Sequence, residues 1–250
     1  MVRFFVSPED ISGGAARLSA EDAAHVRSLR LRPSESFVVC DGEGFDYICR
    51  LGDRSGGGSA AEIIETLPSC GEPTVRCAVF VAYAQGDRLD YAVQKSVELG
   101  AREIVLFPSA RCEAIPRDVA GKVARLRRIA LEAAKQSGRG AVPEVSASAS
   151  FGEALELAAR CSRLPLFLYE EEKERHLKEA LERHDFLLPA SDPRFSISIM
   201  SGPAGGFDPS EAALAKSAGL VTVSLGTRIL RSETAPVAAL AAVMFYTGNL

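Results

Sequence analysis

The sequence predicts an α/β domain with a mostly parallel sheet, preceded by a small β-rich domain. From about residue 74 onward, apolar strand-like segments alternate with helical segments, which is typical of a parallel sheet covered by helices. The first 70 residues instead contain short strand-like segments around one helical segment. Two prolines and a glycine between Leu67 and Pro73 mark the boundary. We therefore expect domains at residues 1–72 and 73–250.

The first domain is expected to be a small barrel with one helix. Asp41 to Gly44, D-G-E-G, predicts a hairpin turn. Residues 19–31 predict a helix that begins at Ser19, because a serine side chain caps a free backbone N–H. The strand candidates, rich in β-branched and aromatic residues, are 2–6, 35–42, 45–52 and 59–67.

The second domain contains five strand candidates and five helix candidates. Apolar residues share one face of the helix predicted at 87–99, and Gly100 ends it. Asp208 and Glu211 are placed to cap another helix. The strand candidates are 74–83, 103–108, 164–170, 196–200 and 220–225. The other helix candidates are 117–137, 170–183 and 233–246, and the most mobile loop is expected at 184–194.

Composition and cysteine usage exclude several classes. The chain is 47% hydrophobic and 25% charged, as in globular proteins of aqueous compartments. No apolar run approaches the ~20 residues that span a bilayer, and the N-terminus does not resemble a signal peptide. We therefore expect a cytoplasmic protein without a membrane segment. The six cysteines form no C-x-x-C pair and there are three histidines, so no metal site is expected and the thiols should be reduced.

Positive charge is concentrated in one part of the chain. The net charge is −4, but residues 73–150 carry 12 basic and 8 acidic side chains. The basic residues crowd between Arg111 and Arg139, which favours contacts with a nucleic-acid backbone. A solvated helix face would give the same pattern.

Two loops that each follow a predicted buried strand are the candidate site. Residues 201–207, S-G-P-A-G-G-F, let the backbone approach a ligand closely. The loop lacks the G-x-G-x-x-G and G-K-[ST] patterns of dinucleotide and P-loop sites. Residues 225–235 place two arginines and a glutamate around an Ile-Leu pair, before an uncharged helix. They predict a pocket floor or, alternatively, an ion-pair network at the helix start. No histidine lies near either loop, so a Ser-His-Asp hydrolase is disfavoured.

The two loops resemble the signature of the SPOUT methyltransferases, and more narrowly that of the RsmE family of 16S ribosomal RNA uridine-N3 methyltransferases. That family has G-P-E-G-G after one strand and L-G-x-R-[IV]-L-R-x-E-T-[AT] after the next. This chain has G-P-A-G-G at 202–206 and L-G-T-R-I-L-R-S-E-T-A at 225–235. Further segments similar to family patterns are R-F-F at 3–5, H-V-R-S-L-R at 25–30 (offset in spacing), Q-K-S-V-E-L-G at 94–100 and E-A-A-K-Q-S-G-R at 132–139.

The resemblance implies more than periodicity can show. It implies S-adenosylmethionine as cofactor, methylation of a small-subunit ribosomal RNA uridine at N3, a role in ribosome biogenesis, a PUA-like RNA-binding domain, a C-terminal trefoil knot and a homodimer. A dimer also fits the sequence, because no charged residue occurs from Thr234 to Leu250. Departures from the family pattern are Ala204 for the usual glutamate, Thr227 for a proline, Lys135 for an acidic residue, and Pro236 early in the last helix. Ala204 bears on activity and cofactor affinity.

The expected site residues follow from the two loops, the resemblance and the chemistry of N3 methylation. The expected catalytic residues are Arg231, Arg228 and Glu233. The expected cofactor-binding residues are Ser201, Gly202, Pro203, Gly205, Gly206, Leu225, Gly226, Ile229 and Leu230. The expected RNA-binding residues are Arg3, Arg30, Arg111, Arg125, Arg128 and Arg139. Two alternatives remain: the same fold acting on another RNA position, such as a ribose 2′-hydroxyl, and a catalytically weak RNA-binding ribosome-assembly protein.

Overall fold

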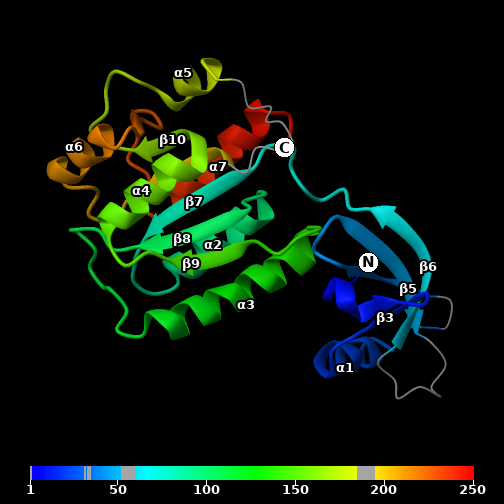
Figure 1. The fold of residues 1–250 in the computed structure, drawn as a ribbon. Helices are drawn as coiled ribbons and strands as arrows, with labels where there is room; N and C mark the ends of the chain where they lie inside the picture. Colours follow the sequence, from blue (N-terminus) through cyan, green and yellow to red (C-terminus); the bar gives the residue numbers. More distant parts are fainter. Residues whose placement is uncertain (1, 31, 33–34, 52–59, 185–194) are drawn as a thin grey trace. The chain divides into compact units, whose positions relative to one another are not determined.

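The computed structural model describes residues 2–30, 32, 35–51, 60–184 and 195–250. The chain forms two compact units (Figure 1). The first unit comprises Met1–Glu72 together with Glu132–Val142, and the second comprises Pro73–Leu131 and Pro143–Leu250. Of the loop expected at 184–194, all but His184 lies outside the described residues.

The first unit contains a six-stranded sheet in the order β1-β4-β5-β6-β3-β2. The parallel pair is β1 with β4, and the other pairs are antiparallel. Phe4 and Phe37 are fully buried at the centre of its core, with their rings edge to face. The strands are β1 Arg3–Phe5, β2 Ile11–Ser12, β3 Ala15–Arg17, β4 Phe37–Cys40, β5 Phe45–Leu51 and β6 Ala60–Pro68, and the helices are η1 Pro8–Asp10 and α1 Ala20–Ser28.

Local sequence signals in this unit are confirmed. The Ser19 side chain accepts a hydrogen bond from the backbone N–H of Asp22, which caps α1 as expected. The Asp41 carboxylate accepts from the backbone N–H groups of Glu43, Gly44 and Phe45, and so forms the turn between β4 and β5. The strands β2 and β3 were not predicted, because each has only two or three residues.

The second unit is built on a parallel sheet of six strands in the order β12-β10-β11-β7-β8-β9. All of its neighbouring strands are parallel, which confirms the expected α/β class. The strands are β7 Cys77–Ala82, β8 Glu103–Phe107, β9 Glu144–Ala147, β10 Ser162–Leu168, β11 Phe195–Ser201 and β12 Val221–Val223. The helices are α2 Arg88–Glu98, α3 Val119–Ser137, α4 Phe151–Cys161, α5 Leu177–Glu182, α6 Pro209–Ser217 and α7 Thr234–Tyr246.

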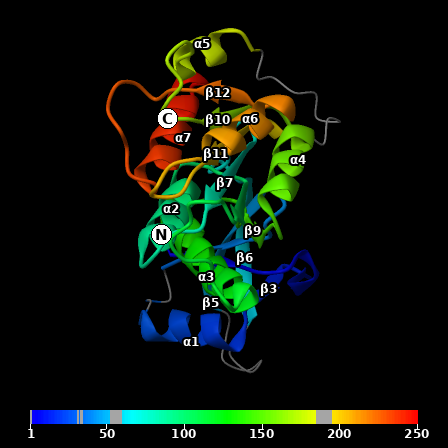
Figure 2. The ribbon, with the colours of Figure 1, turned by 90° about the vertical axis from the view of Figure 1, so that its left-hand side faces the viewer.

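Helices cover both faces of this sheet, with α4 on one side and α2 and α7 on the other (Figure 2). Side chains of a strand alternate between faces. Phe80 and Ala82 of β7 therefore pack in the cluster that includes residues of α4 and α6, whereas their neighbours Val79 and Val81 are buried on the opposite face. Apolar runs such as β7 are buried on both sides, as the sequence indicated.

Two differences from the expected elements have clear causes. The helix predicted at 170–183 is shorter, because α5 begins at Leu177. The preceding residues are held instead by the end of β12: Thr222 Oγ1 donates to the Glu172 carboxylate at 2.6 Å, and His176 bridges to Ser224. In addition, β9 and α4 were not predicted, although Ser150 caps α4.

Candidate functional site

A pocket of about 320 Å³ lies where three adjacent parallel strands, β10, β11 and β12, end. The carboxyl ends of parallel strands are the usual ligand site of such sheets. Both candidate loops line this pocket, together with the residues that follow β10. The lining residues are Leu168, Tyr169, Glu170, Ser201, Gly202, Pro203, Ala204, Gly205, Gly206, Val223, Ser224, Leu225, Gly226, Thr227, Arg228, Ile229, Leu230, Ser232 and Ala235.

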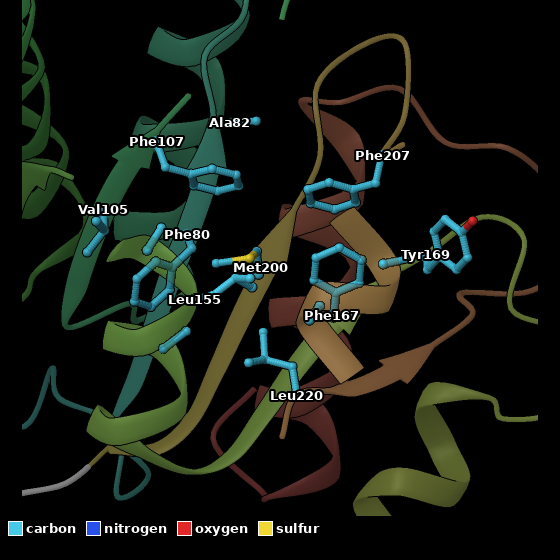
Figure 3. Packing of buried hydrophobic residues seen from close by; sticks show 14 of the residues in the cluster. Phe80, Ala82, Val105, Phe107, Leu155, Phe167, Tyr169, Met200, Phe207 and Leu220 are labelled. Atoms are coloured by element: carbon cyan, nitrogen blue, oxygen red, sulfur yellow. The ribbon is translucent and has the colours of Figure 1, made fainter. Parts of the chain in front are cut away.

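The first loop is anchored in the core by Phe207. Its ring is 1% exposed and stacks on Phe167 with ring centroids 4.1 Å apart (Figure 3). A Cβ atom at residue 202 would come within 2.9 Å of the Phe207 ring, so glycine is required there. Gly206 has a φ of +70°, and a Cβ atom there would overlap the Glu170 carboxylate. The glycines thus let the loop turn sharply beside the pocket.

The second loop joins β12 to α7. Ser224 Oγ accepts a hydrogen bond from the backbone N–H of Gly226, whose φ is +111°. The Ile229 side chain is 87% exposed although it lines the pocket. A large apolar side chain left open to solvent beside a pocket is suited to packing against a flat apolar ligand group.

The three expected catalytic residues are not equally placed. Arg228 lines the pocket, whereas Arg231 and Glu233 are not among its lining residues. The backbone carbonyl of Arg231 accepts from the N–H groups at 234 and 235 and so begins α7. Ser232 Oγ donates to the Glu233 carboxylate at 3.1 Å. Within the described part of the chain, no ion pair joins Arg231 to Glu233, so the alternative of such a pair at the helix start is not observed.

Glu170 is a pocket residue that the sequence reasoning missed. It follows Tyr169 directly at the end of β10, in the charged stretch that was assigned to a helix. Burial, followed by the hydrogen bond to Glu171 and the nearby charge of Glu170, raises the pKa of Tyr169 to about 12. The sequence offers only a partial signal for Glu170, its place after a predicted buried strand, because the position of that strand between the two others follows from the strand order alone.

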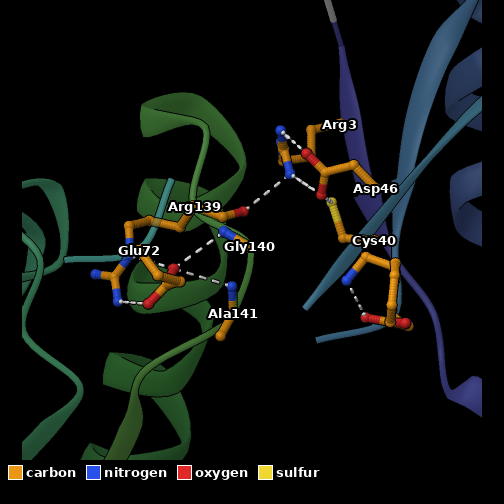
Figure 4. A network of polar contacts seen from close by, with 9 residues as sticks. Arg3, Cys40, Asp46, Glu72, Arg139, Gly140 and Ala141 are labelled. Atoms are coloured by element: carbon orange, nitrogen blue, oxygen red, sulfur yellow. Dashed lines mark hydrogen bonds and ion pairs between the residues drawn. The ribbon is translucent and has the colours of Figure 1, made fainter. Parts of the chain in front are cut away.

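Two of the expected RNA-binding arginines are tied into the interior of the first unit. Arg139 is 2% exposed and forms two hydrogen bonds of 2.7 Å with the Glu72 carboxylate. Arg3 forms a paired contact of 2.8 Å with Asp46 and also donates to the Arg139 carbonyl (Figure 4). Both guanidinium groups are thus held by carboxylates of the first unit, and the RNA contact expected of Arg3 and Arg139 stays a prediction.

The other expected RNA-binding arginines are more accessible. Arg111 is 43% exposed and pairs with Asp208 at 3.0 Å. Arg125 is about half exposed and contacts Asp90 and Asp87. Arg30 and Arg128 are exposed, and no ion pair of either with another described residue is present.

The described residues contain neither a cluster of metal-ligand side chains nor a helix suited to span a membrane. Among them, no group of three or more His, Cys, Asp or Glu side chains is placed to hold a metal ion. None of the helices in the described ranges combines the length and the apolarity that crossing a bilayer requires.

Comparisons with known proteins agree with the geometry. Residues 71–244 match the RNA methyltransferase domain family. The chain is 32% identical over 242 residues to the ribosomal RNA small subunit methyltransferase E of Synechocystis sp., covering 96% of this chain and 76% of the relative. It is 31% identical over 233 residues to the protein of the same name from Bacillus subtilis, covering 92% and 90%.

A solved structure is similar over the whole chain. The ribosomal RNA small subunit methyltransferase E of Neisseria gonorrhoeae, bound to S-adenosyl methionine, is 33% identical, with a TM-score of 0.82 and 98% of each chain covered. The similarity therefore includes both compact units of this chain.

Proposed function

The chain belongs to the RNA methyltransferase family, and within it to the ribosomal RNA small subunit methyltransferases E, and we propose that it methylates N3 of one uridine in small-subunit ribosomal RNA. It is an S-adenosylmethionine-dependent ribosomal RNA methyltransferase. The observation that carries the proposal is that both candidate loops line the same pocket, at the ends of β10, β11 and β12.

The pocket suits this cofactor in shape and chemistry. Its volume of about 320 Å³ matches a compact nucleoside derivative. Leu225, Ile229 and Leu230 offer an apolar surface to the adenine, and the glycine-rich loop offers backbone N–H and C=O groups. The Glu170 carboxylate complements the positive charge of the ligand. The bound cofactor supplies a methyl group on a positively charged sulfur.

The protein's part in the reaction is positioning and electrostatics. The pocket must hold the methyl group in line with the acceptor nitrogen, and the target base must be unpaired or flipped to reach it. Loss of the N3 proton leaves negative charge on the uracil carbonyl oxygens. We assign the stabilisation of that charge to Arg228, and its position in the pocket lining supports this role. We assign Arg231, exposed beside the pocket, to a contact with the RNA strand, and Glu233 to positioning of the second loop.

Several further features are proposed from the family resemblance. They are a PUA-like RNA-binding role for residues 1–72, a C-terminal trefoil knot in the domain 73–250, action in the cytoplasm, and a homodimer. The exposed apolar side chains of Phe245, Tyr246 and Leu250, at and beyond the end of α7, support a partner surface. A monomer mass by light scattering at working concentration would contradict the dimer.

Nucleoside analysis of the reaction product tests the proposal. The purified protein is incubated with small ribosomal subunits, or with their free RNA, and with S-adenosylmethionine carrying an isotopic methyl label. Mass spectrometry of the digested RNA should give labelled N3-methyluridine at one position. Label on a ribose 2′-hydroxyl would support the alternative target. If RNA purified from cells that lack the protein, and therefore unmodified at the target position, takes up no label, the result would support a binding role without catalysis.

A further inference from the structure

One carboxylate stands out among the charged groups at the pocket. Of the described residues that line it, Glu170 is the sole acidic one. The glycine-rich loop, residues 201–207, contains no ionisable side chain, and Glu233 lies outside the lining. Among the described lining residues, Glu170 is therefore the one that offers a full negative charge to a ligand cation.

The position of Glu170 is fixed by the strand order. Because β10 lies between β11 and β12 in the sheet, the residues that follow its end at Leu168, Glu170 among them, stand between the two loops. The Glu170 carboxylate lies so close to Gly206 that any Cβ atom there would overlap it. Its side chain is thus directed over the glycine-rich loop that forms one wall of the pocket.

The two neighbouring glutamates are engaged elsewhere. Glu171 accepts a hydrogen bond of 2.9 Å from the Tyr169 hydroxyl, and Glu172 accepts one of 2.6 Å from Thr222. For Glu170, no hydrogen bond or ion pair with another described residue is present. The nearby cation Arg111 is already paired with Asp208. The Glu170 charge is therefore available to a ligand.

The charge of the ligand changes during methyl transfer. The methyl donor carries a sulfonium and a net charge of +1 in its amino-acid zwitterion, whereas the product carries a neutral thioether sulfur. Glu170 is exposed in the free protein, and its carboxylate attracts the first ligand more strongly than the second, the more so where the bound ligand displaces water from between the charges. We propose that Glu170 is the specificity-determining residue by which the pocket prefers the sulfonium donor to the thioether product. This inference rests on the proposed function, and it also gives a reason for release of the product after each turnover.

Calorimetric titrations of the wild type, one variant and its control with three ligands test this role. Glu170→Gln keeps the shape of the side chain and removes its charge, and Glu171→Gln is the matched control because it removes the same charge one residue away from the pocket. The ligands are S-adenosylmethionine, S-adenosylhomocysteine, and sinefungin, in which a protonated amine on carbon replaces the methylsulfonium. Melting temperatures of all variants check that they are folded.

Glu170→Gln should weaken S-adenosylmethionine binding by about 10-fold, the order expected when one of two opposite charges a few ångströms apart near a protein surface is removed. Sinefungin should lose affinity in parallel, and S-adenosylhomocysteine should change little. Glu171→Gln should bind all three ligands as the wild type does. The ratio of the donor and product dissociation constants is therefore the quantity that moves.

Three results would overturn the inference. Equal losses for donor and product would place the carboxylate against a group that the two ligands share. Unchanged affinities would mean that Glu170 recognises no cation. A slower single-turnover rate at saturating donor, with unchanged affinities, would make Glu170 the acceptor of the N3 proton instead. In each case the wild-type protein still binds the donor and methylates RNA, whereas failure of the wild type to do so would contradict the proposed function itself.

Discussion

At the scale of single residues, Arg228 and Arg231 offer a matched pair. Both are exposed arginines of one loop, but only Arg228 belongs to the pocket lining. Lysine keeps the charge and loses the planar fork that can hold a carbonyl oxygen. We predict that Arg228→Lys lowers the single-turnover methylation rate about 100-fold, as when one preorganised donor is removed. S-adenosylmethionine affinity, measured by calorimetry, should change much less.

The companion variant Arg231→Lys separates a pocket role from a loop role. Its rate at saturating RNA should stay near that of the wild type, and its apparent affinity for RNA should fall. If instead the single-turnover methylation rate falls strongly in Arg231→Lys and stays near the wild-type rate in Arg228→Lys, the roles of the two arginines are reversed.

Asp46 makes the stability of the first unit depend on pH. Burial alone would raise its pKa, but hydrogen bonds from Arg3 and Cys40 and the Arg3 charge outweigh burial and lower the pKa below its usual value. A lowered pKa in the folded state contributes stability above the unfolded value of about 3.9 and loses it as the pH falls through the folded value. The free energy of unfolding, measured by denaturant titration at several pH values below 5, should therefore fall less steeply with decreasing pH in Asp46→Asn than in the wild type. Parallel declines would mean that the pair with Arg3 adds no pH-dependent stability.

At the scale of elements, Glu211 joins the start of α6 to the loop after β8. Its buried carboxylate accepts hydrogen bonds of 2.9–3.0 Å from Ala110 N–H, Ser109 Oγ and Asp208 N–H. We predict that Glu211→Ala destabilises the second unit by about 2–3 kcal/mol, because it leaves buried donors without an acceptor. Chemical denaturation of this variant and of Glu153→Ala, an exposed cap residue of α4, gives the comparison. A similar loss of unfolding free energy in both variants would mean that the burial of Glu211 adds nothing to its contribution to stability.

The basic helix α3 allows a test of RNA contact through salt dependence. Arg128 is exposed and has no ion pair with another described residue, whereas Arg125 already contacts Asp90. We predict that Arg128→Gln reduces the slope of log affinity against log salt by about 0.7, the value for one phosphate contact in a single strand. Arg125→Gln should change the slope less. Identical slopes for the wild type and Arg128→Gln would mean that this face of α3 is exposed to solvent and makes no phosphate contact through Arg128.

The sequence predicted those elements whose signals are local. The caps at Ser19 and Asp208 form as expected, because serine and aspartate satisfy free N–H groups within their own helix. Helix α4 was overlooked although Ser150 and Glu153 carry the same kind of signal. The helix predicted at 170–183 was too long because the partner of Glu172 is Thr222, which lies 50 residues away in the chain.

At the scale of the whole molecule, long-range pairing limits what a sequence can show. Both loops of the pocket were predicted, since each follows an apolar strand and carries its own pattern. Glu170 joins them only because β10 lies between β11 and β12. Arg139 was expected at the surface because of the charge around it, but its partner Glu72 lies 67 residues away. Strand order and distant ion pairs are decided by packing and leave no local pattern.

The central claim is that this pocket binds the cofactor. Its most direct test is a calorimetric titration of S-adenosylmethionine into the wild-type protein and two matched variants. Ile229 and Leu214 are exposed apolar side chains, 87% and 56%, but only Ile229 lines the pocket. Both tolerate lysine without loss of core packing, and a cation at 229 opposes a cationic ligand. We predict binding by wild type and Leu214→Lys, and at least a roughly 10-fold loss in Ile229→Lys. No binding heat with the wild type, or equal affinity in all three proteins, would contradict the account.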